Sequence, residues 1–287
     1  MDNKRHFIFR GHAVAFGGQL IRPKPIVLEA PCSSALTVSG GRSIGRIPPT
    51  RFDEFFSVDS ASTFAEGLFE DPKQFLDSTN HLVEEDTLTA VTHVNAEVNG
   101  LVIGREPRLT IKRVRADLRG RSPLGSGQPA IRVGDLADVF IDGIEIGGRR
   151  LIVELDTAPF QRFDTLAKLL VAADDPAFVE ESGECLFLRT PRDGGPPPPP
   201  AGRLIQTCGA IYGTIVKSIR WDGPAFPAAR IVDNSVVLEP DFGRVFFGEL
   251  LISEYSRRLN MVRFALGSDS GGSASASDVC TNGMLSP

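Results

Sequence analysis

Two stretches of the sequence decide the fold: AEVNGLVIG at residues 96–104 and VFIDGIEIG at residues 139–147. In each, an Asn-Gly or Asp-Gly pair lies between apolar stretches, and a second stretch that begins Arg-Leu follows two or three residues later. Apolar residues at alternate positions are typical of a half-buried β-strand. Asn-Gly and Asp-Gly between such stretches are the strongest short signal for a hairpin turn with positive φ. We therefore predict that Gly100 and Gly143 lie in the turns of two similar β-hairpins.

Most of the remaining sequence has the same character. Gly (29 residues) and Pro (21 residues) separate short runs rich in β-branched residues, a pattern typical of strands joined by tight turns. The clearest helix signal is residues 164–171, where Asp164 is a suitable N-cap, and a helical turn is expected at Asp175-Pro176. We predict an all-β protein, an antiparallel sandwich or jelly-roll-like core with one short helix and long loops.

The chain of 287 residues is long enough for one large β domain. We expect a main β domain at residues 1–190, an exposed Pro-rich loop or linker at 191–200, and strands at 201–287 that complete the same core. Docking of the proline run on an SH3-type surface is the alternative for that loop. Residues 267–278 are rich in Ser, Gly and Ala and predict a mobile tail unless a neighbouring strand holds it.

Charge is strongly segregated along the chain. Residues 53–86 contain ten acids and one base, whereas residues 105–121 contain seven bases and two acids. Residues 52–86 also hold six phenylalanines, the composition of a segment that docks by charge and anchors by aromatic side chains. An ordinary solvated face opposite an ordinary core is the alternative. The expected interface residues are Phe55, Phe56, Phe64, Arg108, Lys112, Arg115 and Arg119.

Composition argues against several classes of protein. The net charge of −5 and the pI near 5.5 predict no nucleic-acid partner. The sequence contains no apolar run of about 18 residues, so we expect no membrane span. The N-terminus has no signal-peptide pattern, which predicts a cytoplasmic chain, with assembly at the cell surface as the alternative. The four cysteines form no CxxC pair and predict buried thiols, although disulfide pairing stays open.

The sequence does not predict an enzyme. SDSGG at residues 268–272 resembles the nucleophile motif of trypsin-like serine peptidases, and that resemblance implies Ser270 as the nucleophile. The flanking residues depart from that family, because Ser268 replaces its Gly and a Ser/Ala-rich stretch replaces its buried strand. Glycine-rich phosphate loops are absent, and the His, Glu and Asp residues between His81 and His93 match no metal-ligand spacing. We expect no catalytic residue, no cofactor and no metal.

Several features together resemble bacterial surface proteins of the choice-of-anchor type. They are PCSSAL at residues 31–36 followed by Gly40-Gly41, the Asn-Gly and Asp-Gly pairs, and FGRVFFGE at 242–249 ahead of the Ser/Gly-rich end. This resemblance implies an all-β fold of unknown activity.

The leading hypothesis for function is a non-enzymatic, self-associating structural subunit of a filament, sheath or shell, with other copies of itself as partners. A surface or ligand-binding β module is the first alternative, and a hydrolase that uses Ser270 is the second.

Overall fold

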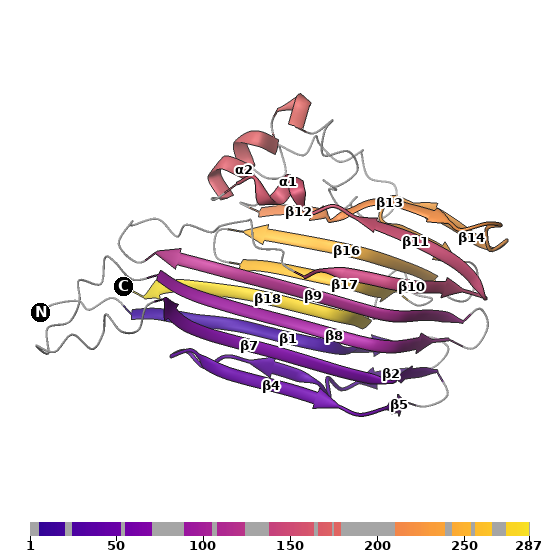
Figure 1. The fold of residues 1–287 in the computed structure, drawn as a ribbon, viewed down its shortest axis with the longest axis horizontal. Helices are drawn as coiled ribbons and strands as arrows, with labels where there is room; N and C mark the ends of the chain where they lie inside the picture. The colour runs from indigo at the N-terminus through magenta and orange to yellow at the C-terminus, as the bar shows by residue number, and fades with distance from the viewer. Residues whose placement is uncertain are drawn as a thin grey trace, which may run out of the picture.

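The computed structural model describes residues 6–20, 25–52, 55–70, 89–104, 108–123, 138–163, 166–173, 175–178, 210–238, 243–253, 256–265 and 274–286. These residues form two antiparallel sheets, each of nine described strands, packed face to face as a sandwich (Figure 1). The prediction of an all-β sandwich is therefore confirmed.

The first sheet, sheet I, contains the N-terminal strand and the C-terminal strands. Its main order is β14-β15-β16-β17-β18-β1-β2, while β3 pairs with β1 and β12 pairs with β16. The strands are β1 (His6–Leu20), β2 (Ile26–Leu28), β3 (Ser33–Ala35), β12 (Ala210–Thr214), β14 (Ala229–Val232), β15 (Ser235–Leu238), β16 (Gly243–Ser253), β17 (Ser256–Ala265) and β18 (Ala274–Ser286).

Strand β18 includes the end of the stretch that predicts a mobile tail. It lies in the middle of sheet I, paired with β17 on one side and with β1 on the other. Ala274 and Ala276 are buried in the core. Neighbouring strands thus hold residues 274–278, the exception that the prediction allowed.

The second sheet, sheet II, has the order β13-β11-β10-β9-β8-β6-β5, while β7 pairs with β8 and β4 pairs with β7. The strands are β4 (Gly41–Ile47), β5 (Thr50–Phe52), β6 (Phe56–Val58), β7 (Ser60–Glu70), β8 (Thr89–Ile103), β9 (Leu109–Pro123), β10 (Phe140–Ile146), β11 (Arg149–Leu155) and β13 (Val216–Trp221).

The helices α1 (Ala158–Gln161) and α2 (Leu166–Ala173) follow β11 and cover one side of the sandwich (Figure 1), and residues 176–178 form a third short helical segment. The described residues therefore contain more helices than the one short helix that we predicted. Phe160 and Leu169 are fully buried against the core that both sheets share. Helix α2 confirms the helix predicted at 164–171 for its described residues. The predicted turn at Asp175 is also present, because the Asp175 carboxylate accepts a 2.9 Å hydrogen bond from the Ala177 N–H.

Small side chains bring the two sheets together at the centre of the sandwich. Ala15 and Ala96, from opposite sheets, are completely buried. The Ser277 hydroxyl of β18 crosses between the sheets and lies 2.8 Å from the carbonyl oxygen of Ala96 and 3.2 Å from that of Val114. A buried hydroxyl needs such a partner, so this contact fixes how β18 faces β8 and β9.

The structure corrects the prediction for Gly100 and Gly143. Both have positive φ, +62° and +64°, but they lie inside β8 and β10 and not in hairpin turns. The register places both beside Lys112 of β9. In β8 the buried positions change from even to odd numbers at this point, from Val98 to Leu101.

A left-handed residue inside a strand reverses the alternation of side chains. The Asn-Gly and Asp-Gly pairs supply such a residue in a strand as readily as in a turn. Two hairpins are nevertheless present further along the chain from these glycines, since β8 pairs with β9 and β10 pairs with β11. The turn between β10 and β11 holds Gly147 and Gly148, both with positive φ.

Candidate functional site

The outer face of sheet II carries a row of charged side chains along β8 and β9. Val114 and Ala116 of β9 are buried, so the odd-numbered residues between Arg113 and Arg121 face away from the core. The register sets polar side chains of the two strands across from one another, with Glu97 opposite Arg115 and His93 opposite Arg119. We call six of these residues the charged band: His93, Glu97, Arg113, Arg115, Asp117 and Arg119.

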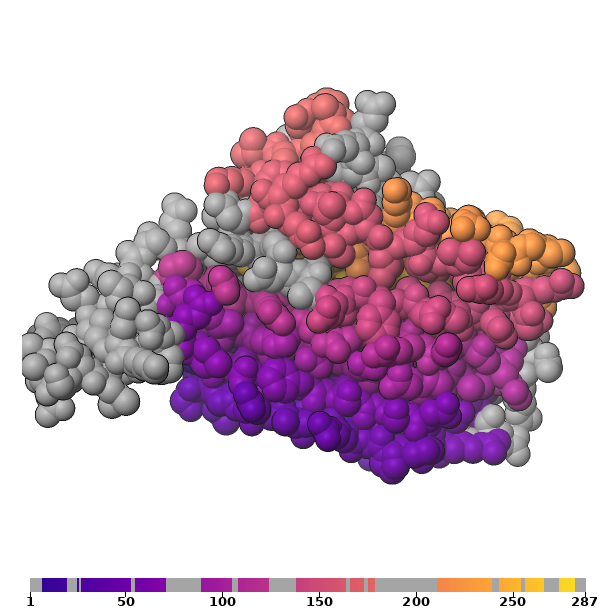
Figure 2. Space-filling model, viewed as in Figure 1, coloured from indigo at the N-terminus to yellow at the C-terminus, as the bar shows by residue number. Residues whose placement is uncertain are grey.

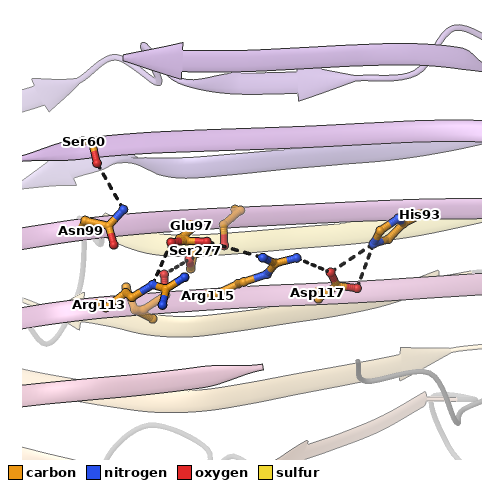
Figure 3. Close-up of polar contacts among 10 residues, drawn as sticks. Ser60, His93, Glu97, Asn99, Arg113, Arg115, Asp117 and Ser277 are labelled. Atoms are coloured by element: carbon orange, nitrogen blue, oxygen red, sulfur yellow. Dashed lines mark hydrogen bonds and ion pairs between the residues drawn. The ribbon is translucent and has the colours of Figure 1, made fainter. Parts of the chain in front are cut away.

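Asp117 is the centre of the charged band (Figure 3). Its side chain is completely buried, and both carboxylate oxygens lie within 3.1 Å of His93 Nε2. Arg115 Nη2 donates a 3.1 Å hydrogen bond to it, and Arg119 Nε lies 3.9 Å away. A carboxylate without solvent requires this number of partners to remain charged.

Glu97 links the other end of the band. It accepts a 2.9 Å hydrogen bond from Arg113 Nε, and Arg115 Nη1 lies 3.5 Å from it. Arg115 therefore bridges the two acids, and its Nε is buried without a hydrogen-bond partner. The guanidinium group of Arg113 also stacks over the Phe140 ring at 4.5 Å. The arginines are thus held in fixed positions.

Bases outnumber acids in this region. Lys112, next to the band on β9, is exposed and has no ion-pair partner among the described residues. With histidine counted as uncharged, Lys112 and the three arginines of the band oppose three acids, because Asp142 of β10 lies opposite Arg113 beside Glu97 and Asp117, and this leaves +4 − 3 = +1. About half of the Arg113 and Arg119 side chains is exposed (50% and 45%), so this positive charge is accessible to a partner.

The outer face continues onto β7 and β4. The His93 ring packs edge-to-face on Phe64 at 5.2 Å between centroids, and the Arg42 guanidinium lies 5.7 Å from the centroid of the same ring. Arg42 Nε donates a 2.9 Å hydrogen bond to Glu66. Phe64, a predicted anchor, is therefore half-buried beside the band.

The other predicted interface residues are scattered. Lys112, Arg115 and Arg119 lie together on the outer face, but Arg108 lies before β9, where its carbonyl accepts the Gly147 N–H. Phe56 is 3% exposed and packs on Phe16 in the core, and Phe55 packs against the same core. We therefore withdraw both residues as anchors, since this chain's own core occupies them.

The acidic side of the predicted contact is described only in part. Glu66 binds Arg42, and Glu70 lies 2.8 Å from Arg121 of the same chain. Residues 53–54 and 71–86 lie outside the described residues, as do Ser270 and the stretch from His81 to Asp86. Sequence reasoning missed Glu97 and Asp117 as partners of the arginines, although the alternation of Asp117 with Arg115 and Arg119 at a period of two was a usable signal for Asp117.

The outer face of sheet I is organised differently. Arg258 forms two hydrogen bonds with Asp278, and Arg263 binds Glu249 at 2.6 and 2.8 Å. Arg258 and Arg263 thus each bind one acid through two hydrogen bonds. Beside them, burial raises the pKa of the Cys280 thiol, which lies 3.5 Å from the Ser256 hydroxyl.

The described residues contain no group of three or more His, Cys, Asp or Glu side chains arranged to hold a metal ion. No helix in this part of the chain is long and apolar enough to cross a membrane. Cys32 and Cys280 are both buried.

Comparison with known proteins gives a family and no function. A model of a family described as a domain of unknown function, DUF8256, matches residues 7–184. The match includes β1 to β11 and hence the whole charged band, whereas β12 to β18 lie beyond it. No curated protein and no solved structure matches the chain, and the resemblance to choice-of-anchor proteins stays a prediction. Because the matched residues make up more than half of the sequence, the chain belongs to the DUF8256 family.

Proposed function

We propose that this protein is a non-enzymatic structural subunit that associates with other copies of itself through the outer face of sheet II. The observation that supports the proposal is the charged band, which is ordered, partly exposed and net basic. Because hydrogen bonds already hold Arg113 and Arg115 in place, a partner pays little side-chain entropy to bind these two arginines.

The charge of the whole chain supports another copy as the partner. The net charge is −5, so a region of +1 leaves −5 − 1 = −6 on the rest of the molecule. The basic face of one copy is therefore complementary to acidic surface on another. Such a contact joins two different patches, so it is heterologous and produces an open polymer unless the rotation closes a ring.

The His93–Asp117 pair fits a structural role better than a catalytic one. Among the described residues, the His93 ring hydrogen bonds to Asp117 alone and packs on Phe64. A catalytic dyad of this kind needs a nucleophile within hydrogen-bond reach of the histidine. In this pair, His93 instead holds the buried Asp117 carboxylate in place, and that carboxylate positions Arg115 and Arg119.

Sedimentation velocity of charge-reversal variants tests the proposal. Lys112→Glu combined with Arg119→Glu should abolish concentration-dependent association at low salt. Arg10→Glu combined with Lys217→Glu is the matched control, because it changes the net charge equally at exposed positions away from the band. Equal loss of association in both double variants would contradict a specific role of sheet II. A wild-type protein that stays monomeric would favour the ligand-binding module.

A further inference from the structure

The two long sides of the sandwich end differently. On one side, α1 and α2 pack over the space between the sheets, with Phe160 and Leu169 in the common core. On the other side, sheet II ends at β4, which lies along the lower edge in Figures 1 and 2. Neither helix reaches that edge.

Strand β4 is a long and regular edge. All seven of its residues pair with β7 without a change of register, and its other side has no paired strand among the described residues. Edge strands β2, β3 and β5 have three residues each, and β14 has four. The opposite edge of sheet II, β13, carries exposed Lys217 and Arg220, as β4 carries exposed Arg42 and Arg46, but β13 also has a register shift against β11 that β4 lacks. Natural proteins use such features to block edge-to-edge pairing.

Apolar side chains are exposed beside this edge. Ile44, at the centre of β4, is 56% exposed and lies opposite Phe64 of β7. Leu68 of β7 is 41% exposed, and Val38, just before β4, is 68% exposed. With respect to the described residues, the edge therefore offers both backbone groups without a strand partner and apolar surface.

We infer that β4 pairs antiparallel with β4 of a second copy across a two-fold axis, so that sheet II continues from one copy into the other. This inference rests on the proposed function in that both describe self-association. It adds a second, isologous contact on a different part of the surface, in which the same residues face each other from both copies.

The sequence of β4 is self-complementary in one register. With Ser43 on the axis, Arg42 lies opposite Ile44 and Gly41 lies opposite Gly45. No two arginines are then directly opposite, and Glu66 already neutralises Arg42 within each copy. A register centred on Ile44 would place Arg42 opposite Arg46, which like-charge repulsion disfavours. The register centred on Ser43 therefore accommodates a second copy without directly opposed arginines.

The two contacts differ in their response to salt. The β4 contact is made by backbone hydrogen bonds and apolar side chains, whereas the contact of the band is electrostatic and is screened within about 8 Å at physiological ionic strength. At high salt we therefore expect a dimer held by β4 alone. The two-fold contact leaves the band free for head-to-tail association at low salt.

Sedimentation equilibrium at high salt tests the inference. Ile44→Lys should raise the dimer dissociation constant by about tenfold or more. Val171→Lys is the control, because Val171 is 74% exposed on α2, and it should leave the dimer unchanged. A wild-type monomer at high salt, or an Ile44→Lys protein that dimerises normally, would overturn the inference.

Cross-linking identifies the register in a chain whose Cys185 and Cys208 are replaced by Ser. Ser43→Cys should give a disulfide-linked dimer on mild oxidation, since residues opposite one another in antiparallel strands are close enough to bridge. Ser218→Cys in β13 should not. Efficient cross-linking at residue 218 and none at residue 43 would assign the dimer to the other edge. The Lys112→Glu/Arg119→Glu double variant should still cross-link at residue 43, because the β4 contact does not use the charged band. Cross-linking at residue 43 therefore tests the β4 contact separately from the proposed function of the band.

Discussion

The outer faces of the two sheets bury carboxylates in different ways. On sheet I, Asp278 has one arginine, Arg258, whose side chain is 50% exposed. On sheet II, Asp117 is shared by His93, Arg115 and Arg119, and Arg115 is also bound to Glu97. On sheet I, Arg258 and Arg263 each bind one acid, whereas on sheet II a single arginine, Arg115, bridges two acids and a single acid, Asp117, has several cationic neighbours.

The two faces therefore differ in how much charge stays available to a partner after their internal contacts are made. An arginine and an acid that bind each other one to one cancel each other's charge, so such a pair leaves little charge for a partner. In the network, a single buried acid positions more than one cation, so the face keeps positive charge after all its internal contacts are made. Removing the shared acid should therefore affect several side chains at once, which gives the comparison a measurable consequence.

The largest effect is expected from Asp117→Ala. The change leaves Arg115, which is only 24% exposed, without its buried partner, and should lower the free energy of unfolding by about 3 kcal/mol. Asp278→Ala should cost less, about 1–2 kcal/mol, because half-exposed Arg258 can turn to water. Urea denaturation of both variants measures the difference. An equal or larger loss for Asp278→Ala would show that the network is no more cooperative than a pair.

A smaller effect is expected from Gly143→Ala, which disturbs the point where the alternation of sheet II reverses beside Lys112. Gly143 has φ of +64°, and a Cβ there would lie 2.5 Å from Lys112 Cβ. The loss should be about 1–2 kcal/mol. Gly120→Ala in β9 is the control, since a Cβ there would meet nothing closer than 3.7 Å. Thermal denaturation should separate the two variants, and similar melting temperatures would remove strain as the cause.

The sequence predicts the strands of these faces better than their contacts. Alternating apolar residues predict β9 and its basic outer side, because period-two burial follows directly from strand geometry. The partners of Arg115 depend on the register between β8 and β9, which one sequence does not determine. The reversal at Gly100 depends on register too, since Asn-Gly is compatible with a turn and with a kinked strand. Phe56 resembled an anchor because composition does not separate a core phenylalanine from an interface one.

The smallest effect on stability is expected from Lys112→Glu. Lys112 is exposed and has no ion-pair partner among the described residues, so the free energy of unfolding should change by about 0.5 kcal/mol or less. Self-association at low salt should nevertheless weaken, because the charge is lost from the basic face. Unfolding and sedimentation data on the same sample test this separation. A loss of stability as large as that of Asp117→Ala would place Lys112 inside the network.

The central claim is that the basic face of sheet II joins copies of this protein, and sedimentation of the unmodified chain tests it most directly. A concentration series should be measured at low salt and again at high salt. The account predicts species larger than a dimer at low salt that dissociate as salt rises, because screening weakens contacts between surface charges. A sedimentation coefficient that depends on neither concentration nor salt would contradict it.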